Sequence, residues 1–374
     1  MAFTVPGTVG SGDDLLRVQR AWPGRRDGAA ARIVLEGTDP EGRVRAAELG
    51  LDRAGEGWVP GRLRVAPHGW DERLPGLAAA AAEGTVVVHR HGRRAVVRRS
   101  DRFVKVVRPG RGPEVAARAE LGRRTAITAG MSAPAVLEVT DDRVDFGVLP
   151  GASLHDLART ASPREWSAWW AGWAERWPDL ARSVGRGHAA AAVLPSHTAG
   201  DECATLRDWV DRAVAFGVLP ATVLEAPLQR VTAALAHGRP DDAVVVHRDL
   251  HDKQLLAEGS ALGVLDFDTA SLAEPALDLA NLAVHARLRV EQGWWPAERA
   301  HVVLAAVTRA AAELGVGPAR LAAYAAATRL RLACVYAFRP RWVPLARRWA
   351  LGLDENSLTR LSSPAQIGGG AWEA

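Results

Sequence analysis

The stretch that decides the fold runs from Val244 to Asp268 and reads VVVHRDLHDKQLLAEGSALGVLDFD. Its first apolar run ends at His247-Arg248-Asp249, and a polar amide, Gln254, follows five residues after that aspartate. A turn at Glu258-Gly259-Ser260 leads into a second apolar run, which ends at Asp266-Phe267-Asp268. Two short strands joined by a turn are predicted here, and they would deliver three oxygen ligands to one place.

The side chains of this stretch suit phosphoryl transfer. The carboxylate of Asp249 would meet the acceptor hydroxyl, while the Gln254 amide oxygen and the Asp266 carboxylate would hold magnesium on the nucleotide phosphates. Two aspartates and an amide in this order therefore predict a nucleotide- and magnesium-dependent site.

Lysine is rare in this chain. There are 47 Lys plus Arg, but only Lys105 and Lys253 are lysines. Because arginine serves everywhere else, these two positions indicate sites that need a compact ammonium rather than a planar guanidinium. Lys105, in the strand-like run 103–107, is predicted to reach the α- and β-phosphates of the nucleotide, with a drifted composition as the alternative. For Lys253, a phosphate contact and a solvated loop position are both open.

Length and composition limit the class of protein. A chain of 374 residues with 48% hydrophobic content can build one large or two ordinary domains. The net charge of +4 would permit nucleic-acid binding, but the arginines are scattered among 43 acidic residues, so no nucleic-acid partner is expected. Two cysteines argue against a disulfide framework. Without a signal-peptide pattern or a membrane-length apolar run, a cytoplasmic protein with no membrane partner is expected.

Pro150-Gly151 marks the expected boundary between residues 1–149, an N-terminal lobe, and residues 150–374, a C-terminal lobe. In the first lobe we expect a loose start over residues 1–30, and then a series of strands and helices. These are a hairpin at 32–35 and 43–49, a helix at 76–83, strands at 85–89, 95–99 and 103–107, a helix at 114–127, and strands at 136–139 and 145–149. In the second lobe, helical patterns occupy 205–216, 222–237, 276–289, 296–314 and 318–338.

Two side-chain clusters in the second lobe are ambiguous. Five tryptophans between Trp166 and Trp177 recur at helical spacing, which is more typical of a buried face than of a cation–π wall for a ligand. Four arginines between Arg329 and Arg341 gather near the end of the last predicted helix. Most such groups are solvated, although these would suit an anionic acceptor better than a polycationic aminoglycoside.

Three motifs together resemble the aminoglycoside phosphotransferase and choline kinase superfamily. They are 247–251 (HRDLH), 265–268 (LDFD) and 274–280 (EPALDLA). The resemblance implies an α+β, two-lobed, protein-kinase-like fold, with a small β-rich N-terminal lobe and a larger, mainly helical C-terminal lobe. Lys105 comes late for this family, so the small lobe carries an N-terminal extension that the sequence does not explain.

The resemblance also implies roles for individual residues. Asp249 would be the catalytic carboxylate, Gln254 and Asp266 the magnesium ligands, and Asp268 a helper for a second metal. Lys105 and Glu120 would form the ion pair that positions the phosphates. Asp278 would anchor the catalytic loop. The hinge that holds the purine would include Val148 and Leu149.

The order of the motifs favours a small-molecule acceptor. Eleven residues separate Asp266 from Asp278, which leaves little room for the peptide-docking loop of protein kinases. The expected activity is therefore transfer of the γ-phosphoryl group of ATP, with GTP possible, to a hydroxyl of a sugar, an aminoglycoside-like molecule or an amino alcohol. Asp145-Phe146-Gly147 precedes the catalytic loop and cannot be the metal motif. The oligomeric state stays open.

Two departures from the family keep a second hypothesis alive. Gln254 stands where the family usually has Asn, and the candidate nucleotide turn at His89–Arg94 has a single glycine, so Arg90, Arg93 or Arg94 would have to help hold the phosphates. The alternative is a catalytically silent kinase-like protein that binds a nucleotide or a partner.

Overall fold

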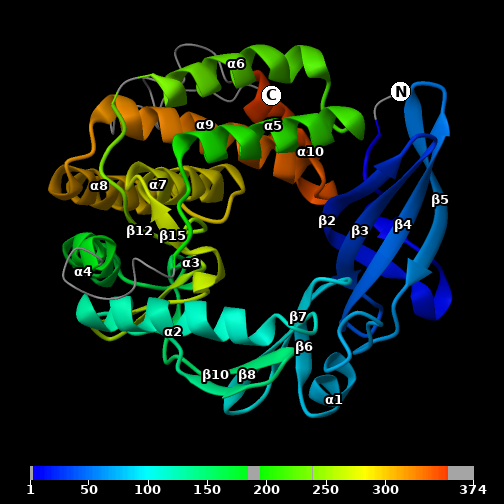
Figure 1. Cartoon of the computed structure of the whole chain (residues 1–374), viewed down its shortest axis with the longest axis horizontal. Helices are drawn as coiled ribbons and strands as arrows, with labels where there is room; N and C mark the ends of the chain where they lie inside the picture. The colour runs from blue at the N-terminus through cyan, green and yellow to red at the C-terminus, as the bar shows by residue number, and fades with distance from the viewer. Residues whose placement is uncertain (1–2, 184–193, 238, 353–374) are drawn as a thin grey trace.

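The computed structural model describes residues 3–183, 194–237 and 239–352. Two antiparallel sheets make up the N-terminal part of the chain, and helices dominate the part after residue 153 (Figure 1). This arrangement confirms the expected α+β class with a β-rich N-terminal and a mainly helical C-terminal region. Among the described residues, no helix combines the length and apolarity needed to cross a membrane.

The N-terminal extension is a five-stranded antiparallel sheet with its strands in chain order. The expectation of a loose start was wrong, because Leu16, Val18 and Ala21 are buried and alternate with exposed polar residues along the second strand. Dense arginines obscured this alternation in the sequence. The sheet contains β1 (Thr8–Val9), β2 (Leu16–Asp27), β3 (Ala30–Thr38), β4 (Val44–Ala54) and β5 (Gly57–Val65), with the 3₁₀ turn η1 (Gly12–Asp14) after β1.

The second sheet follows α1 (Leu77–Ala82) and confirms the predicted meander. Its strand order is β6-β7-β8-β10-β9, and Lys105 lies on β8, the central strand. The last strand ends at Gly147 rather than at residue 149, so Val148 and Leu149 lie in the connection to the helical region. The elements are β6 (Thr85–Arg90), β7 (Arg94–Arg98), β8 (Arg102–Val107), α2 (Gly112–Thr128), β9 (Val136–Val139) and β10 (Arg143–Gly147).

The helical region surrounds α7, whose residues are almost all buried and which packs on α8 and α9. Its helices are α3 (Leu154–Leu157), α4 (Pro163–Ala181), α5 (Ala199–Ala215), α6 (Ala221–Ala236), α7 (Ala276–Glu291), α8 (Ala297–Leu314), α9 (Pro318–Ala337) and α10 (Val343–Leu351). Short strands and 3₁₀ turns connect them: β11 (Ala152–Ser153), β12 (Val244–Val246), β13 (Leu255–Glu258), β14 (Ala261–Val264), η4 (Phe267–Thr269), β15 (Ser271–Ala273) and η5 (Pro340–Trp342).

The tryptophans of α4 belong to the core, as the favoured interpretation predicted. A capping box between Ser162 and Glu165 starts this helix. Four of the five indoles are at most 1% exposed, which excludes them from an open ligand wall, and they are Trp166, Trp170, Trp173 and Trp177.

The N-terminal sheet contacts both other parts of the molecule. Trp58 Nε1 on β5 donates a 2.8 Å hydrogen bond to the Ala215 carbonyl, and its ring packs on Phe216 at the end of α5. On the opposite side, Glu36 of β3 accepts a hydrogen bond of 2.9 Å from the His89 amide of β6. The extension therefore links the second sheet to the helical region.

Candidate active site

The loop of residues 247–254, which contains the predicted catalytic residue Asp249, connects β12 to the predicted hairpin of β13 and β14. The Gln254 amide donates to the His251 carbonyl at 2.9 Å and closes the loop. The Gln254 carbonyl in turn accepts from the Leu265 amide, also at 2.9 Å, which joins the loop to the segment after β14. Both ends of the motif are thereby brought together, as the sequence predicted.

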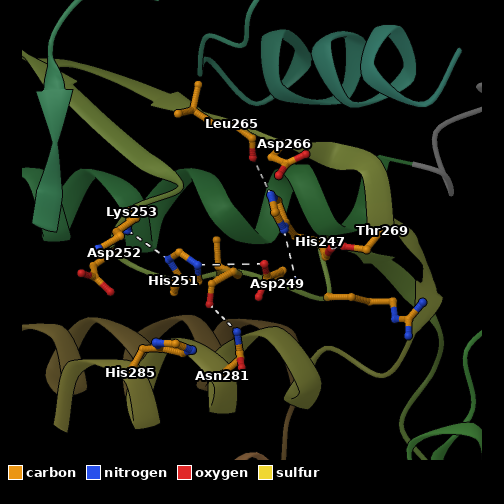
Figure 2. Close-up of polar contacts among 12 residues, drawn as sticks. His247, Asp249, His251, Asp252, Lys253, Leu265, Asp266, Thr269, Asn281 and His285 are labelled. Atoms are coloured by element: carbon orange, nitrogen blue, oxygen red, sulfur yellow. Dashed lines mark hydrogen bonds and ion pairs between the residues drawn. The ribbon is translucent and has the colours of Figure 1, made fainter. Parts of the chain in front are cut away.

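His247 braces this loop from inside the protein. Its side chain is fully buried, and Nε2 lies 2.7 Å from the Leu265 carbonyl (Figure 2). Nδ1 accepts a 3.3 Å hydrogen bond from the Asp249 amide. Through these two contacts His247 joins the loop to the segment after β14 and supports it from inside.

Asp278 of α7 anchors the start of the loop. Its carboxylate accepts hydrogen bonds from the amides of His247 at 2.5 Å and of Arg248 at 2.8 Å. Burial raises the pKa of Asp278 to about 6, although the charge of His247 and the two amides act in the opposite direction. The anchoring role predicted for this residue is confirmed.

The same face of α7 holds the rest of the loop. Asn281 Nδ2 donates to the Leu250 carbonyl at 2.8 Å, and the His285 ring lies 4.8 Å from the His251 ring (Figure 2). Residues 278, 281, 285 and 289 are spaced by three or four, so they share one helix face. Sequence reasoning identified only the first of them, although this spacing of polar residues within an apolar helix was a readable signal.

Asp252 and Arg289 form a buried ion pair beneath the loop. Arg289 Nε lies 2.9–3.0 Å from both Asp252 oxygens, and His155 Nδ1 lies 2.5 Å from Oδ2. Burial raises the pKa of Asp252, but the Arg289 charge and the His155 hydrogen bond outweigh it and hold that pKa well below its usual range. This pair joins the loop to α7 and to α3, and the sequence analysis did not identify it.

Two residues of the site have strained backbones. Arg248 and Asp266, with φ of 67° and 61°, are the non-glycine residues with positive φ in the described part of the chain. Such conformations cost on the order of 1–3 kcal/mol each and persist where surrounding contacts enforce them, often at functional sites.

Lys105 meets the two aspartates of the second motif. Its Nζ lies 2.9 Å from Asp266 Oδ1 and also bonds Asp268 Oδ2. Arg94 NH1 approaches Asp268 at 3.6 Å and Asp266 at 4.0 Å. Of the three arginines considered for the nucleotide turn, Arg94 thus lies beside the predicted metal ligands.

The pKa values of Asp266 and Asp268 are shifted in opposite directions. Burial raises the pKa of Asp266, but Lys105 and Arg94 outweigh it and hold that pKa below its usual range. Burial raises the pKa of Asp268, and the charge of Asp266 raises it further. Carboxylate oxygens are hard ligands suited to Mg²⁺, so this donor set fits the predicted metal.

A pocket of about 590 Å³ opens above this cluster. Lys105, Asp266 and Asp268 form its polar end. Its apolar walls come from both sides of the hinge and include Val88, Val96, Phe103, Phe146, Val148 and Leu149. Asp249, Gln254 and Glu120 lie outside the lining, and the Asp249 side chain is 51% exposed.

The ion pair predicted between Lys105 and Glu120 is not formed in this structure. Glu120 instead pairs with Arg123 at 3.0 Å and with Arg124 at 3.3 Å. Both arginines follow Glu120 by one helical turn, where a short-range pair forms at little conformational cost. Lys105, on another element, is left with Asp266 and Asp268.

The helix α2 reaches the site through other residues. Arg118 NH1 donates to the Asp268 carbonyl at 2.6 Å. Gly122 packs so closely on Phe267 that a Cβ there would lie 2.0 Å from the ring. A glycine inside a predicted helix was the available signal for this close approach.

Asp71 braces the turn at His89–Arg94. The Gly92 amide donates to it at 2.7 Å, and His89 Nε2 lies 3.1 Å from the same carboxylate oxygen. Burial raises the pKa of Asp71, but its hydrogen bonds to His89, His91 and Gly92 hold it well below its usual range. The Asp71 side chain therefore holds this turn, which contains a single glycine.

Solved structures of other proteins align with this chain. The chain aligns with the solved GDP complex of wild-type aminoglycoside 2'-phosphotransferase-IIIa at a TM-score of 0.51 and 14% identity, covering 73% of this chain and 91% of that one. The GDP and kanamycin complex of APH(2")-IIia aligns at 0.50 and 12% identity, covering 78% and 97%. A choline/ethanolamine kinase family protein from Mesorhizobium loti aligns at 0.46 and 18% identity, covering 79% and 92%.

The first two likenesses show the kinase-like two-lobed fold. No curated protein matches the sequence. The family model described as "Phosphotransferase enzyme family" matches residues 82–324, which span the second sheet, the catalytic loop and most of the helical region but exclude the N-terminal sheet. The chain belongs to the phosphotransferase enzyme family.

Proposed function

We propose that this protein is an ATP-dependent O-phosphotransferase that acts on a hydroxyl of a small molecule such as a sugar, an aminoglycoside-like compound or an amino alcohol. The observation that carries the proposal is Lys105 held between Asp266 and Asp268 at the polar end of an apolar-walled pocket. Solved structures with the same fold were determined as GDP complexes, which supports nucleotide binding and keeps GTP as a possible donor. We assign residues 1–149 to nucleotide binding and 150–374 to catalysis and acceptor binding.

In this proposal each residue has a distinct task. Val148 and Leu149 flank the purine, and Lys105 contacts the phosphates. Asp266, Asp268 and Gln254 would hold Mg²⁺, which supplies positive charge to the phosphates when bound. Asp249, outside the nucleotide pocket, receives the acceptor hydroxyl. The bond from the γ-phosphorus to the bridging oxygen breaks, the acceptor oxygen bonds to that phosphorus, and the hydroxyl proton passes to Asp249 and then to solvent.

An acceptor screen tests the proposal directly. The protein is incubated with Mg-ATP and a panel of sugars, aminoglycosides and amino alcohols, and products are read by the mass gain of one phosphate. Conversion that requires both the protein and Mg²⁺ supports the assignment. Intact nucleotide binding with no phosphorylated product from any acceptor would favour the silent kinase-like alternative.

Replacing Lys105 with alanine is expected to raise the KM for ATP by about tenfold or more, because a charge-assisted contact to phosphate is lost. The fold should persist, since the ammonium lies at the pocket surface. Lys105→Arg should rescue poorly, because the wider guanidinium does not fit the space between Asp266 and Asp268. Steady-state kinetics with a thermal melt measure both effects. Unchanged kinetic constants in Lys105→Ala would show an ordinary strand lysine.

Substitutions of Gln254 distinguish an active phosphotransferase from the catalytically silent alternative. If its amide oxygen binds Mg²⁺, Gln254→Ala should lower turnover by at least about tenfold, because octahedral oxygen ligation tolerates little misplacement. Gln254→Asn should fall between alanine and the parent, since its amide is one methylene shorter. Kinetics and a Mg-nucleotide complex structure provide the check. A Gln254 oxygen beyond coordinating distance in that complex would contradict the assignment.

A further inference from the structure

Three side chains that can ligate a metal meet at the turn between β6 and β7, and the proposed phosphoryl transfer uses none of them. They are Asp71, His89 and His91. Among the residues that the structure describes, they form the one cluster of three or more His, Cys, Asp or Glu side chains whose ligand atoms all lie within 4.8 Å of one another. Asp71 Oδ2 lies 3.1 Å from His89 Nε2 and 3.1 Å from His91 Nδ1.

Two separate segments bring these side chains together. His89 lies on β6 and His91 follows it by two residues, a spacing that sends both rings to the same side of an extended chain. Asp71 comes from the segment between β5 and α1. Asp71 and His89 are buried, whereas the His91 side chain is 15% exposed. The cluster is therefore held inside the protein, and His91 gives a path of entry from solvent.

The Asp71 Oδ2 atom has more neighbours than its lone pairs can serve. The Gly92 amide donates to this oxygen at 2.7 Å, and both imidazole nitrogens approach the same atom. A carboxylate oxygen offers about two lone-pair sites, so the two rings compete for the one that Gly92 leaves. A cation on that lone pair would be bound by both imidazoles at once. The other oxygen, Oδ1, accepts the Arg73 amide at 2.9 Å, which fixes the orientation of the carboxylate.

The ligand set selects the kind of metal. Two imidazole nitrogens and one carboxylate oxygen suit Zn²⁺, whereas Mg²⁺ prefers oxygen ligands throughout. Tetrahedral zinc with bonds of about 2.0–2.1 Å keeps its ligand atoms about 3.3 Å apart. Both distances from Asp71 Oδ2 to the imidazoles, at 3.1 Å, are close to that separation. Three protein ligands leave a fourth position for water, on the exposed side of His91.

We propose that Asp71, His89 and His91 bind a Zn²⁺ ion that fastens the turn at His89–Arg94 to the segment before α1. Arg94 ends this turn, and its NH1 lies 3.6 Å from Asp268 at the polar end of the nucleotide pocket. The ion thereby stabilises the turn that presents Arg94 to the pocket. This site goes beyond the proposed function and does not depend on it.

Zinc binding tests the proposal without any reaction. The untagged full-length protein is freed of metal with a chelator and titrated with Zn²⁺ in excess Mg²⁺, which competes for Asp266 and Asp268. Calorimetry and elemental analysis should find one zinc ion per chain. His91→Gln should weaken binding by about 100-fold or more, because losing a direct ligand costs more than the 10- to 100-fold typical of an outer partner. Absence of saturable zinc binding, or an unchanged affinity in His91→Gln, overturns the proposal.

His197→Gln is a matched control. His197 is buried like His89, and its Nε2 lies 3.0 Å from a carboxylate oxygen of Glu202, outside the cluster. This variant should keep one zinc ion with the affinity of the parent. An equal loss in His197→Gln and His91→Gln would assign the loss to a disturbed fold or another site, and would count against the cluster.

X-ray absorption at the zinc edge needs no variant. The spectrum of the zinc-loaded parent should show two imidazoles and oxygen ligands at about 2.0–2.1 Å. A sulfur ligand at about 2.3 Å would place the ion on a cysteine instead. A spectrum without two imidazoles would equally exclude the proposed site.

Hydrogen exchange tests the effect on the turn. Zn²⁺ should slow exchange of the amides of residues 89–94 in the parent and leave them unchanged in His91→Gln, because the ion joins the turn to Asp71. Zinc binding without protection of this turn would contradict the fastening role. None of these measurements uses catalysis, so a negative acceptor screen leaves the zinc site standing, and a failure to bind zinc leaves the phosphotransferase function standing.

Discussion

Asp249→Asn is expected to lower turnover by about 10²–10⁴-fold, the range for loss of a general base, while nucleotide binding stays nearly unchanged. Asparagine keeps the shape of the side chain but removes the charge that receives the acceptor proton. The Asp249 side chain is half exposed and outside the lining of the nucleotide pocket, and its amide is held by His247. The substitution should therefore disturb neither the pocket nor the loop.

Single-turnover rates and nucleotide titrations of the same preparation measure the two effects separately. Asp242, which is exposed just before β12, provides a control, and Asp242→Asn should behave as the parent. Near-normal turnover of Asp249→Asn would remove this residue from the mechanism. Equal losses of turnover and nucleotide affinity would instead indicate a distorted loop.

Asp266→Ala should weaken both Mg-nucleotide binding and turnover. A metal ligand contributes several kcal/mol of charge stabilisation, so the expected loss of rate is about 10²-fold or more. Binding suffers too, because the metal neutralises the phosphates in the ground state as well as in the transition state. In the metal-free protein, Lys105 would keep only Asp268 as its carboxylate partner.

Calorimetry with and without Mg²⁺ is the decisive measurement for Asp266. The parent should bind ATP more tightly with Mg²⁺ than without it, and that difference should shrink in Asp266→Ala. Unchanged affinity for Mg-ATP would count against the metal role. Asp268→Ala should have a smaller effect, since it is proposed only to assist a second metal.

Local patterns were sufficient for most of the secondary structure and for the identity of the motif. The strand containing Lys105, the hairpin before Asp266 and the tryptophan face of α4 were all predicted from short-range spacing. These features depend on neighbours within a few residues, where periodicity and turn residues are informative. In the N-terminal sheet only the hairpin of β3 and β4 was predicted, and β2 was missed because arginine-rich exposed positions obscured the alternation of Leu16 and Val18.

The partners of the site residues required the tertiary structure. Lys105 was expected to pair with Glu120, but it meets Asp266 and Asp268, which lie 161 and 163 residues later in the chain. Glu120 has arginines one turn away on its own helix. Which pair forms depends on the distances between elements, and no sequence spacing encodes those distances.

The sequence by itself determined the family and the mixed α+β class, because both rest on residue types at short spacing. Only the tertiary structure decided how the loop is supported and what surrounds it. Arg289 lies 37 residues from Asp252, and Asn281 of α7, whose side chain holds the Leu250 carbonyl, lies 31 residues from Leu250. Such contacts arise when packed elements bring distant polar groups together, where burial strengthens their interaction.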